Sequence, residues 1–289
     1  MSTTATTTPQ PSDSKKLRIL CLHGYTQTGP LFRAKTRALE KSLSKHLAPL
    51  FPSGVELFFP DAPVLLSKAD FPPSFSAPAL DSNADAEEEA RAWWRRKDVP
   101  EGTRYDGLEG SMAFLGDVVR REGPFAGVLG FSQGAAAAVL FASLVETGRR
   151  GVFESLHAEG KGIEYPLPEE VQPFSFVVSY SGFRAPAASG YDAFYQGGVR
   201  TPSLHFIGSV DTVVSEERSL DLLKACRDGV EDGEARHRVV YHPGGHFVPA
   251  SQKMPVNALV GFIQDVMGGA GREQKVDGEG GVEDMDVPF

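Results

Sequence analysis

Residues 125–144 read FAGVLGFSQGAAAAVLFASL, and this stretch decides the fold. An apolar run of strand length leads into Gly130, Ser132 and Gly134 in the pattern G-x-S-x-G, and an Ala-rich segment of helix length follows. The order predicts a buried strand, a sharp turn and a buried helix, with Ser132 in strained backbone geometry between small neighbours. The alternative interpretation is a glycine-rich turn whose serine merely caps the helix.

The same alternation of apolar runs and helical periodicity extends outward in both directions. Apolar runs of strand length occupy residues 17–22, 55–59, 125–131, 174–179, 204–207 and 238–241. Helical spacing occupies residues 31–47, 108–121, 135–147 and 256–267, and a shorter helix follows Asp211. Strands that are apolar throughout are buried on both faces, and their alternation with helices indicates βαβ units. The sequence therefore predicts one α/β domain with a mainly parallel sheet and helices on both faces.

The flanks of this pattern and one insertion differ in composition. Residues 1–16 are rich in Thr, Ser and Pro, and residues 268–289 are acidic and rich in Gly, so we expect a disordered arm and a disordered tail around a domain at 17–267. Residues 62–105 are proline-rich and acidic and contain Trp93 and Trp94. We interpret them as a small cap over a pocket at the sheet edge, with a solvated surface loop as the alternative.

Composition limits the classes of function. The chain has 289 residues, with 29 basic and 38 acidic side chains and a formal net charge of −9, which argues against a nucleic-acid partner. No apolar run approaches the ~18 residues of a membrane span. The two cysteines, Cys21 and Cys226, are too few for a disulfide framework or a structural zinc site, so we expect a reducing compartment. In its β-strand, Cys21 is expected to be buried and inert.

A serine nucleophile needs a base, and His246 is the best of seven histidines. It follows the last predicted strand after Gly244 and Gly245, which allow a sharp loop back over the sheet edge. The other six are expected to be structural or peripheral: His23, His205 and His242 packed or hydrogen-bonded, His46 and His157 on a polar helix face or in a loop, and His237 in a charged loop.

Asp211 is the best carboxylate to orient that base. It follows the strand at 204–207, and it is therefore expected at the same sheet edge as Ser132. Asp192 and Asp221 are weaker competitors, and the alternative for Asp211 is a helix N-cap. The chain order Ser132, Asp211, His246 is the order of the α/β-hydrolase fold. We expect the backbone N–H groups of Tyr25 and Gln133 to form an oxyanion hole.

Six segments carry a resemblance to a known family. They are LCLHGYTQTG (20–29), FPDAPVLL (59–66), RAWW (91–94), GPFAGVLGFSQGAAAA (123–138), FIGSVDTVV (206–214) and HPGGHFVP (242–249). Over about residues 17–266 the sequence resembles the FSH group, the small serine hydrolases of fungi and animals. The resemblance places nucleophile, acid and base on Ser132, Asp211 and His246. It implies esterase or thioesterase activity on acyl substrates in the cytosol, and some fungal relatives resemble product-releasing hydrolases of polyketide pathways.

The functional hypothesis is acyl transfer to water from a small-molecule ester or thioester, without metal or organic cofactor. One alternative is a thioesterase that releases a polyketide or acyl group from a carrier partner. Another is a hydrolase-like module that binds an ester without cleaving it. For the acyl group we expect contacts from Trp93, Trp94 and Phe71, because the insertion's aromatic side chains need an apolar surface.

Overall fold

The computed structural model describes residues 16–67, 70–71, 90–100, 102–186 and 190–269. Almost all of the predicted terminal arm and tail, and the middle of the insertion, lie outside these residues.

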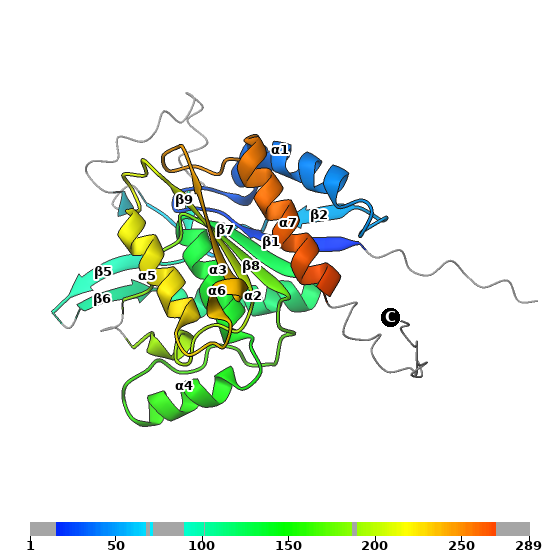
Figure 1. Cartoon of the computed structure of the whole chain (residues 1–289). Helices are drawn as coiled ribbons and strands as arrows, with labels where there is room; N and C mark the ends of the chain where they lie inside the picture. Colours follow the sequence, from blue (N-terminus) through cyan, green and yellow to red (C-terminus); the bar gives the residue numbers. More distant parts are fainter. Residues whose placement is uncertain (1–15, 68–69, 72–89, 101, 187–189, 270–289) are drawn as a thin grey trace, which may run out of the picture.

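A six-stranded sheet forms the centre of the molecule, and each neighbouring pair of its strands is parallel (Figure 1). The spatial order of the strands is β10-β9-β8-β7-β1-β2. They are β1 (Leu17–Leu22), β2 (Val55–Phe58), β7 (Gly127–Phe131), β8 (Phe176–Tyr180), β9 (Ser203–Gly208) and β10 (His237–His242). Every residue of β7, β8 and β9 is buried, as expected for strands covered on both faces. The predicted α/β class with a parallel sheet is confirmed.

The strand order reverses between β1 and β7. β2 lies on one side of β1, whereas β7 to β10 follow on the other side. In an open parallel sheet such a reversal leaves a crevice at the carboxyl ends of the two middle strands. The loops that follow Leu22 and Phe131 therefore meet at this crevice.

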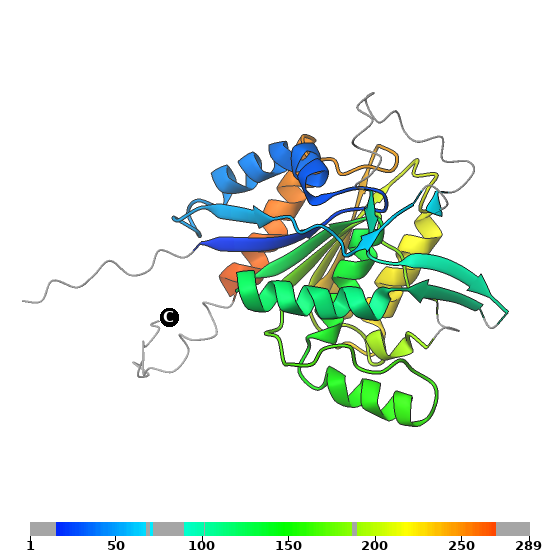
Figure 2. The same ribbon diagram turned by 180° about the vertical axis from the view of Figure 1, so that it is seen from behind.

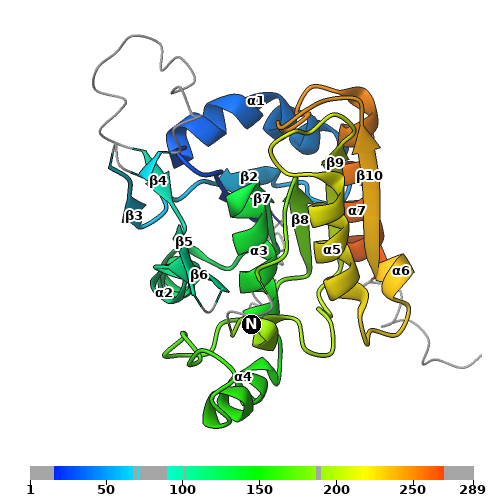
Figure 3. The ribbon, with the colours of Figure 1, turned by 90° about the vertical axis from the view of Figure 1, so that its left-hand side faces the viewer.

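Helices cover both faces of the sheet (Figures 2 and 3). One face carries α1 (Gly29–His46) and α7 (Lys253–Gly269), and the other carries α2 (Leu108–Glu122), α3 (Gln133–Leu144) and α5 (Glu216–Arg227). Each face has its own apolar cluster, so the sheet is sealed from water on both sides. Shorter helical elements are α4 (Arg149–Ala158), η4 (Asp192–Phe194) and α6 (Gly233–Arg236).

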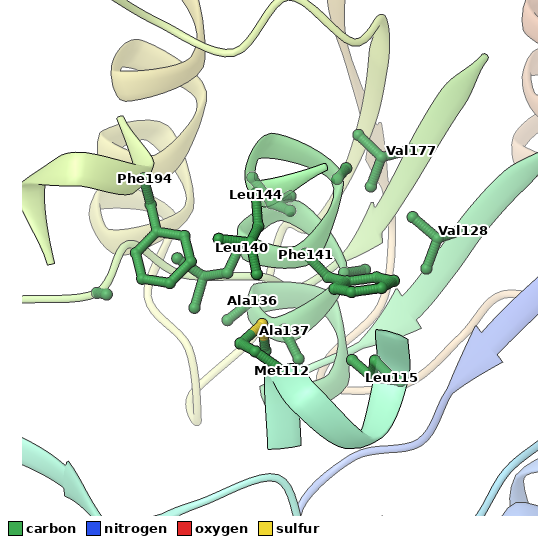
Figure 4. Packing of buried hydrophobic residues seen from close by; sticks show 14 of the residues in the cluster. Met112, Leu115, Val128, Ala136, Ala137, Leu140, Phe141, Leu144, Val177 and Phe194 are labelled. Carbon is green, nitrogen blue, oxygen red and sulfur yellow. The ribbon is translucent and has the colours of Figure 1, made fainter. Parts of the chain in front are cut away.

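Helix α3 is buried along its whole length. A helix that is apolar all round belongs in the interior, and its alanines let it lie close to β7 and β8. Figure 4 shows Leu140 and Phe141 of α3 among Met112 and Leu115 of α2 and Val128 of β7. The residue that precedes α3, Ser132, is thus attached to one of the most tightly enclosed elements of the fold.

The insertion at 62–105 forms two small antiparallel sheets in its described parts. β3 (Val64–Leu65) pairs with β4 (Arg91–Ala92), and β5 (Arg95–Val99) pairs with β6 (Gly102–Asp106). The β5–β6 hairpin projects from the body of the molecule (Figures 1 and 2). Between β4 and β5, both tryptophans are buried in the core beside α3.

Candidate active site

Ser132 stands on a strained turn between β7 and α3. Its backbone has φ 54° and ψ −119°, a conformation that residues with a side chain rarely adopt. A Cβ atom on Gly130 would overlap the carbonyl group of Gly134, and one on Gly134 would overlap the carbonyl oxygens of Leu22 and His23. The turn predicted for the G-x-S-x-G pattern is present, and both glycines are required by the close approach of β1, β7 and α3.

The loop after β10 brings His246 to this serine. The distance from His246 Nε2 to Ser132 Oγ is 2.9 Å. The imidazole packs at 4.8 Å, centroid to centroid, against the ring of Phe131. A backbone hydrogen bond of 3.2 Å from Val210 N–H to the carbonyl oxygen of Gly244 joins this loop to the loop after β9. Two loops far apart in the chain are thereby held together at one edge of the sheet.

Asp211 sits in the loop after β9 and contacts the other ring nitrogen. The distance from Asp211 Oδ2 to His246 Nδ1 is 2.8 Å, and the Asp211 side chain is only 1% exposed. An ionised carboxylate only accepts, so Nδ1 carries the ring proton and Nε2 is left to accept the serine proton. The predicted residues Ser132, His246 and Asp211 therefore form a continuous hydrogen-bonded chain.

The remaining lone pairs of Asp211 are also used. Its Oδ1 accepts hydrogen bonds from the backbone N–H groups of Val213 and Val214 at 2.9 and 3.0 Å, and its Oδ2 accepts a hydrogen bond from the hydroxyl of Ser181 at 2.8 Å. Burial raises the pKa of this carboxyl, but the hydrogen bonds from His246, Val214 and Ser181 outweigh burial and lower the pKa below its usual value. The carboxylate is therefore held ionised and in one orientation.

Sequence reasoning missed Ser181. This residue follows β8 directly, with φ 51°, and its backbone N–H donates to the carbonyl oxygen of Phe206. The available signal was its position, because a polar residue at the carboxyl end of a parallel strand faces the same edge as the other site residues.

The two predicted oxyanion donors come from the ends of the strands at the crevice. Tyr25 follows β1 and Gln133 begins α3, and both line one pocket with Ser132. Within the described chain, neither backbone N–H has a protein acceptor. The first N–H groups of a helix carry partial positive charge, so the Gln133 amide suits a developing anion.

The side chain of Gln133 has a separate role that the sequence did not indicate. Its Oε1 accepts the backbone N–H of Trp93 at 2.9 Å, and its Nε2 donates to the carbonyl oxygen of Trp94 at 2.9 Å. The indole N–H of Trp93 donates to the carbonyl oxygen of His23 at 2.9 Å. The insertion is thus tied to both loops that border the crevice.

A pocket of about 500 Å³ lies beside Ser132. Among the predicted substrate contacts, only Trp94 lines it. Trp93 is fully buried and lies outside the lining, and Phe71 is half-buried and packs against the small cluster around Leu66. The structure therefore corrects the prediction for Trp93, whose side chain packs in the core, whereas the substrate contact of Phe71 stays a prediction.

Three other buried histidines have structural roles. Nε2 of His205 and Nδ1 of His237 each lie 2.7 Å from Ser203 Oγ. His237 is the first residue of β10 and is buried, so its prediction as part of a charged loop is wrong. Nε2 of His23 accepts the backbone N–H of Ala62 at 3.0 Å. Burial lowers the pKa of His205 to about 3 and the pKa values of His23 and His237 to about 4, so all three are neutral.

The described residues contain neither a metal-binding cluster nor a membrane-spanning helix. No group of three or more His, Cys, Asp or Glu side chains there is placed to hold a metal ion. None of the helices in this part of the chain combines the length and apolar character needed to cross a bilayer.

The fold and the site together define a class. A parallel sheet with a serine on a strained turn, an imidazole and a buried carboxylate at its carboxyl edge is the arrangement of α/β-hydrolases. The chain belongs to the family described as Serine hydrolase (FSH1), whose profile matches residues 12–258. The resemblance stated from the motifs is therefore confirmed.

Several curated relatives agree with this family. "Esterase OVCA2" of Danio rerio is 35% identical over 246 residues, which cover 81% of this chain and 91% of that protein. "Family of serine hydrolases 3" of Saccharomyces cerevisiae is 31% identical over 282 residues, with 95% and 94% covered. A Schizosaccharomyces pombe protein named "Dihydrofolate reductase" is 32% identical over 238 residues, which cover 82% of this chain but only 44% of that longer protein.

Solved structures share the fold at low sequence identity. Acyl-protein thioesterase 2 of Zea mays superimposes with a TM-score of 0.51 at 20% identity, covering 88% of this chain and 97% of that one. SOBER1 of Arabidopsis thaliana gives a TM-score of 0.53 at 17% identity, with 87% and 99% covered. Together with the parallel sheet, these likenesses identify the α/β-hydrolase fold.

Proposed function

We propose that this protein hydrolyses carboxylic esters or thioesters of acyl substrates, with Ser132 as nucleophile, His246 as base and Asp211 as the acid that orients the base. The observation that carries the proposal is the chain of two hydrogen bonds, 2.9 Å from Ser132 to His246 and 2.8 Å from His246 to Asp211. A serine hydroxyl is a weak nucleophile until a neighbouring base takes its proton. This geometry supplies that base in the required tautomer.

The reaction proceeds through an acyl-enzyme. His246 Nε2 takes the hydroxyl proton as Ser132 Oγ attacks the substrate carbonyl carbon, and the oxyanion accepts the backbone N–H groups of Tyr25 and Gln133. The C–O or C–S bond then breaks, and His246 returns the proton to the leaving alcohol or thiol. In the second half, His246 takes a proton from water, whose oxygen attacks the acyl carbon. His246 then returns that proton to Ser132 Oγ as the bond between Oγ and the acyl carbon breaks, which releases the carboxylic acid and restores the free serine.

The substrate class follows from the family and the pocket. Relatives named as esterases support an ester, and the half-apolar pocket beside Ser132 has the size of a small-molecule site. A carrier-bound thioester is the alternative from the same chemistry. The two free, buried cysteines support the expectation of a reducing compartment such as the cytoplasm.

Active-site labelling tests the nucleophile. We expect a fluorophosphonate probe to label the native protein and the Ser209→Ala variant, which lacks an exposed serine of the neighbouring loop, but not Ser132→Ala. Equal labelling of the native protein and Ser132→Ala would refute the mechanism. Absence of labelling in all three would favour an ester-binding module without catalysis.

A hydrolysis panel then separates the two substrate classes. Hydrolysis of aryl esters and of acyl thioesters with matched chain length is measured, and the Ser132→Ala variant serves as the blank. Preference for thioesters at every chain length would favour the thioesterase alternative, and the reverse preference would favour a carboxylesterase.

A further inference from the structure

Arg218 lines the pocket beside Ser132 and has no ionic partner among the described residues. It comes from the first turn of α5, and its Cζ lies 4.5 Å from the centroid of the Phe183 ring. In the part of the chain that the structure describes, it forms no salt bridge. By contrast, the other cations of the lining are paired: Arg95 with Asp70, Arg96 with Asp98, and Lys97 with Asp106.

The described lining of the pocket carries a net positive charge, although the protein is acidic. Its described lining holds four cationic side chains and two acidic ones, whereas the whole chain holds 29 and 38. A concave site with an excess of one charge raises the local concentration of ligands of the opposite charge. The charge distribution therefore favours an anionic substrate in a protein that otherwise repels anions.

The walls around Arg218 suit a small molecule with an apolar body and a charged end. Trp94, Phe183 and Val214 supply apolar surface, and Trp94 is itself stacked on Tyr105 at 4.7 Å. Ser132 and Arg218 line the same pocket of about 500 Å³, which is the size of a small-molecule site. Contact with Phe183 restricts the guanidinium and leaves N–H groups free for an acceptor.

We propose that Arg218 binds an anionic group, a carboxylate or a phosphate, on the ester or thioester that Ser132 cleaves. This inference rests on the proposed hydrolase function and adds the charge of its substrate. The planar guanidinium donates two parallel hydrogen bonds to two oxygens of such a group. The apolar walls hold the chain that links this group to the scissile carbonyl.

Two matched substrate pairs test the proposal and locate the anion. The first pair is mono-p-nitrophenyl glutarate and p-nitrophenyl pentanoate, in which only the acyl end differs in charge. The second pair is pentanoyl-coenzyme A and the pentanoyl thioester of N-acetylcysteamine, which share the acyl group, whereas the leaving thiol of coenzyme A adds phosphates together with an adenosine and a longer pantetheine chain. Each is assayed with native protein, Arg218→Gln and Arg104→Gln. Arg104 is an exposed cation of β6 outside the pocket lining, so its removal controls for loss of one charge.

We expect Arg218→Gln to lower kcat/KM about 10- to 150-fold for the anionic member of one pair, the loss typical of a hydrogen bond to a charged group. The neutral members and the Arg104→Gln variant should stay close to native values. A response in the glutarate pair places the anion on the acyl group, and a response in the coenzyme A pair places it on the leaving group.

The negative outcomes are distinct. If neutral esters are hydrolysed but Arg218→Gln affects both members of each pair alike, the role of Arg218 is refuted and the Ser132 mechanism stands. If no substrate is hydrolysed and Ser132 is not labelled, the hydrolase function and the role of Arg218 both fail. Thermal unfolding of each variant checks that the exposed substitutions leave the fold intact.

Discussion

Replacing Asp211 by Asn tests how the carboxylate controls the tautomer of His246. The two carboxylate oxygens accept four hydrogen bonds: Oδ1 from the N–H groups of Val213 and Val214, and Oδ2 from His246 and Ser181. An Asn side chain has the same shape but only one oxygen. It can therefore no longer accept hydrogen bonds both from the N–H groups of the loop and from the imidazole.

The magnitude follows from the two possible orientations. If the amide oxygen faces the loop, the NH₂ group donates to Nδ1 of His246, and the ring proton moves to Nε2, where it blocks transfer from Ser132. The opposite orientation leaves the N–H groups of Val213 and Val214 without acceptors, at about 1–3 kcal/mol each. The inactive arrangement is thus favoured by about 2–6 kcal/mol, which lowers the competent fraction by about 30-fold to about 10⁴-fold.

The assay is kcat on an aryl ester, measured with the unfolding temperature of the same preparation. We expect kcat of Asp211→Asn to fall within that range, with KM and fold preserved. Asp228→Asn, at an exposed aspartate just after α5, removes the same charge and should behave as native. A folded Asp211→Asn variant with near-native kcat would show that this carboxylate does not set the tautomer.

Three other predictions use different parts of the structure. Ser181→Ala removes a hydrogen bond that lowers the pKa of Asp211, so we expect kcat to fall about tenfold and the acid limb of the pH profile to move to higher pH; an unmoved acid limb would contradict the positioning role. Gly134→Ala forces a Cβ against β1 and should lower the free energy of unfolding by about 1–3 kcal/mol, whereas Gly151→Ala in α4, where a Cβ meets no atom within 4 Å, should raise it by about 0.5–1 kcal/mol. Urea unfolding measures both, and equal shifts would refute the steric argument. Burial lowers the pKa values of His23, His205 and His237 to between about 3 and about 4. As the pH drops below about 6.5 the unfolded chain therefore binds protons first, and the free energy of unfolding decreases by up to about 1.4 kcal/mol per pH unit for each histidine. A midpoint of urea unfolding that stays constant from about pH 7 down to about pH 5 would contradict this linkage.

Local pattern predicted most of the central fold. Continuous apolar runs marked β7, β8 and β9 because these strands are buried on both faces, and the four-residue spacing of Leu39 and Leu43 marked α1. The β5–β6 hairpin was missed because its strand reads RRKDV and has no apolar alternation. α4 was also absent from the prediction.

The sequence predicted residues of the candidate site that follow predicted strands. Ser132, Asp211 and His246 each follow a strand of a parallel sheet, so their convergence was expected from topology. Two other contacts depend on side chains and do not follow from strand order. The Gln133 side chain binds the backbone of the insertion about 40 residues away, and Arg218 contacts Phe183 more than 30 residues away. Trp93 was misplaced for a related reason, because its apolar character alone does not distinguish a core position from a pocket wall.

The double hydrogen bond from the Gln133 side chain limits how this enzyme can diversify. The main-chain amide of this residue borders the pocket beside Ser132, where we propose that the oxyanion binds, and its side-chain amide holds the backbone of Trp93 and Trp94. A change that displaces this backbone to admit a different acyl group also disturbs the amide beside Ser132. New selectivity is therefore expected to arise by exchanging side chains on the pocket wall while the path of the main chain between β4 and β5 is retained.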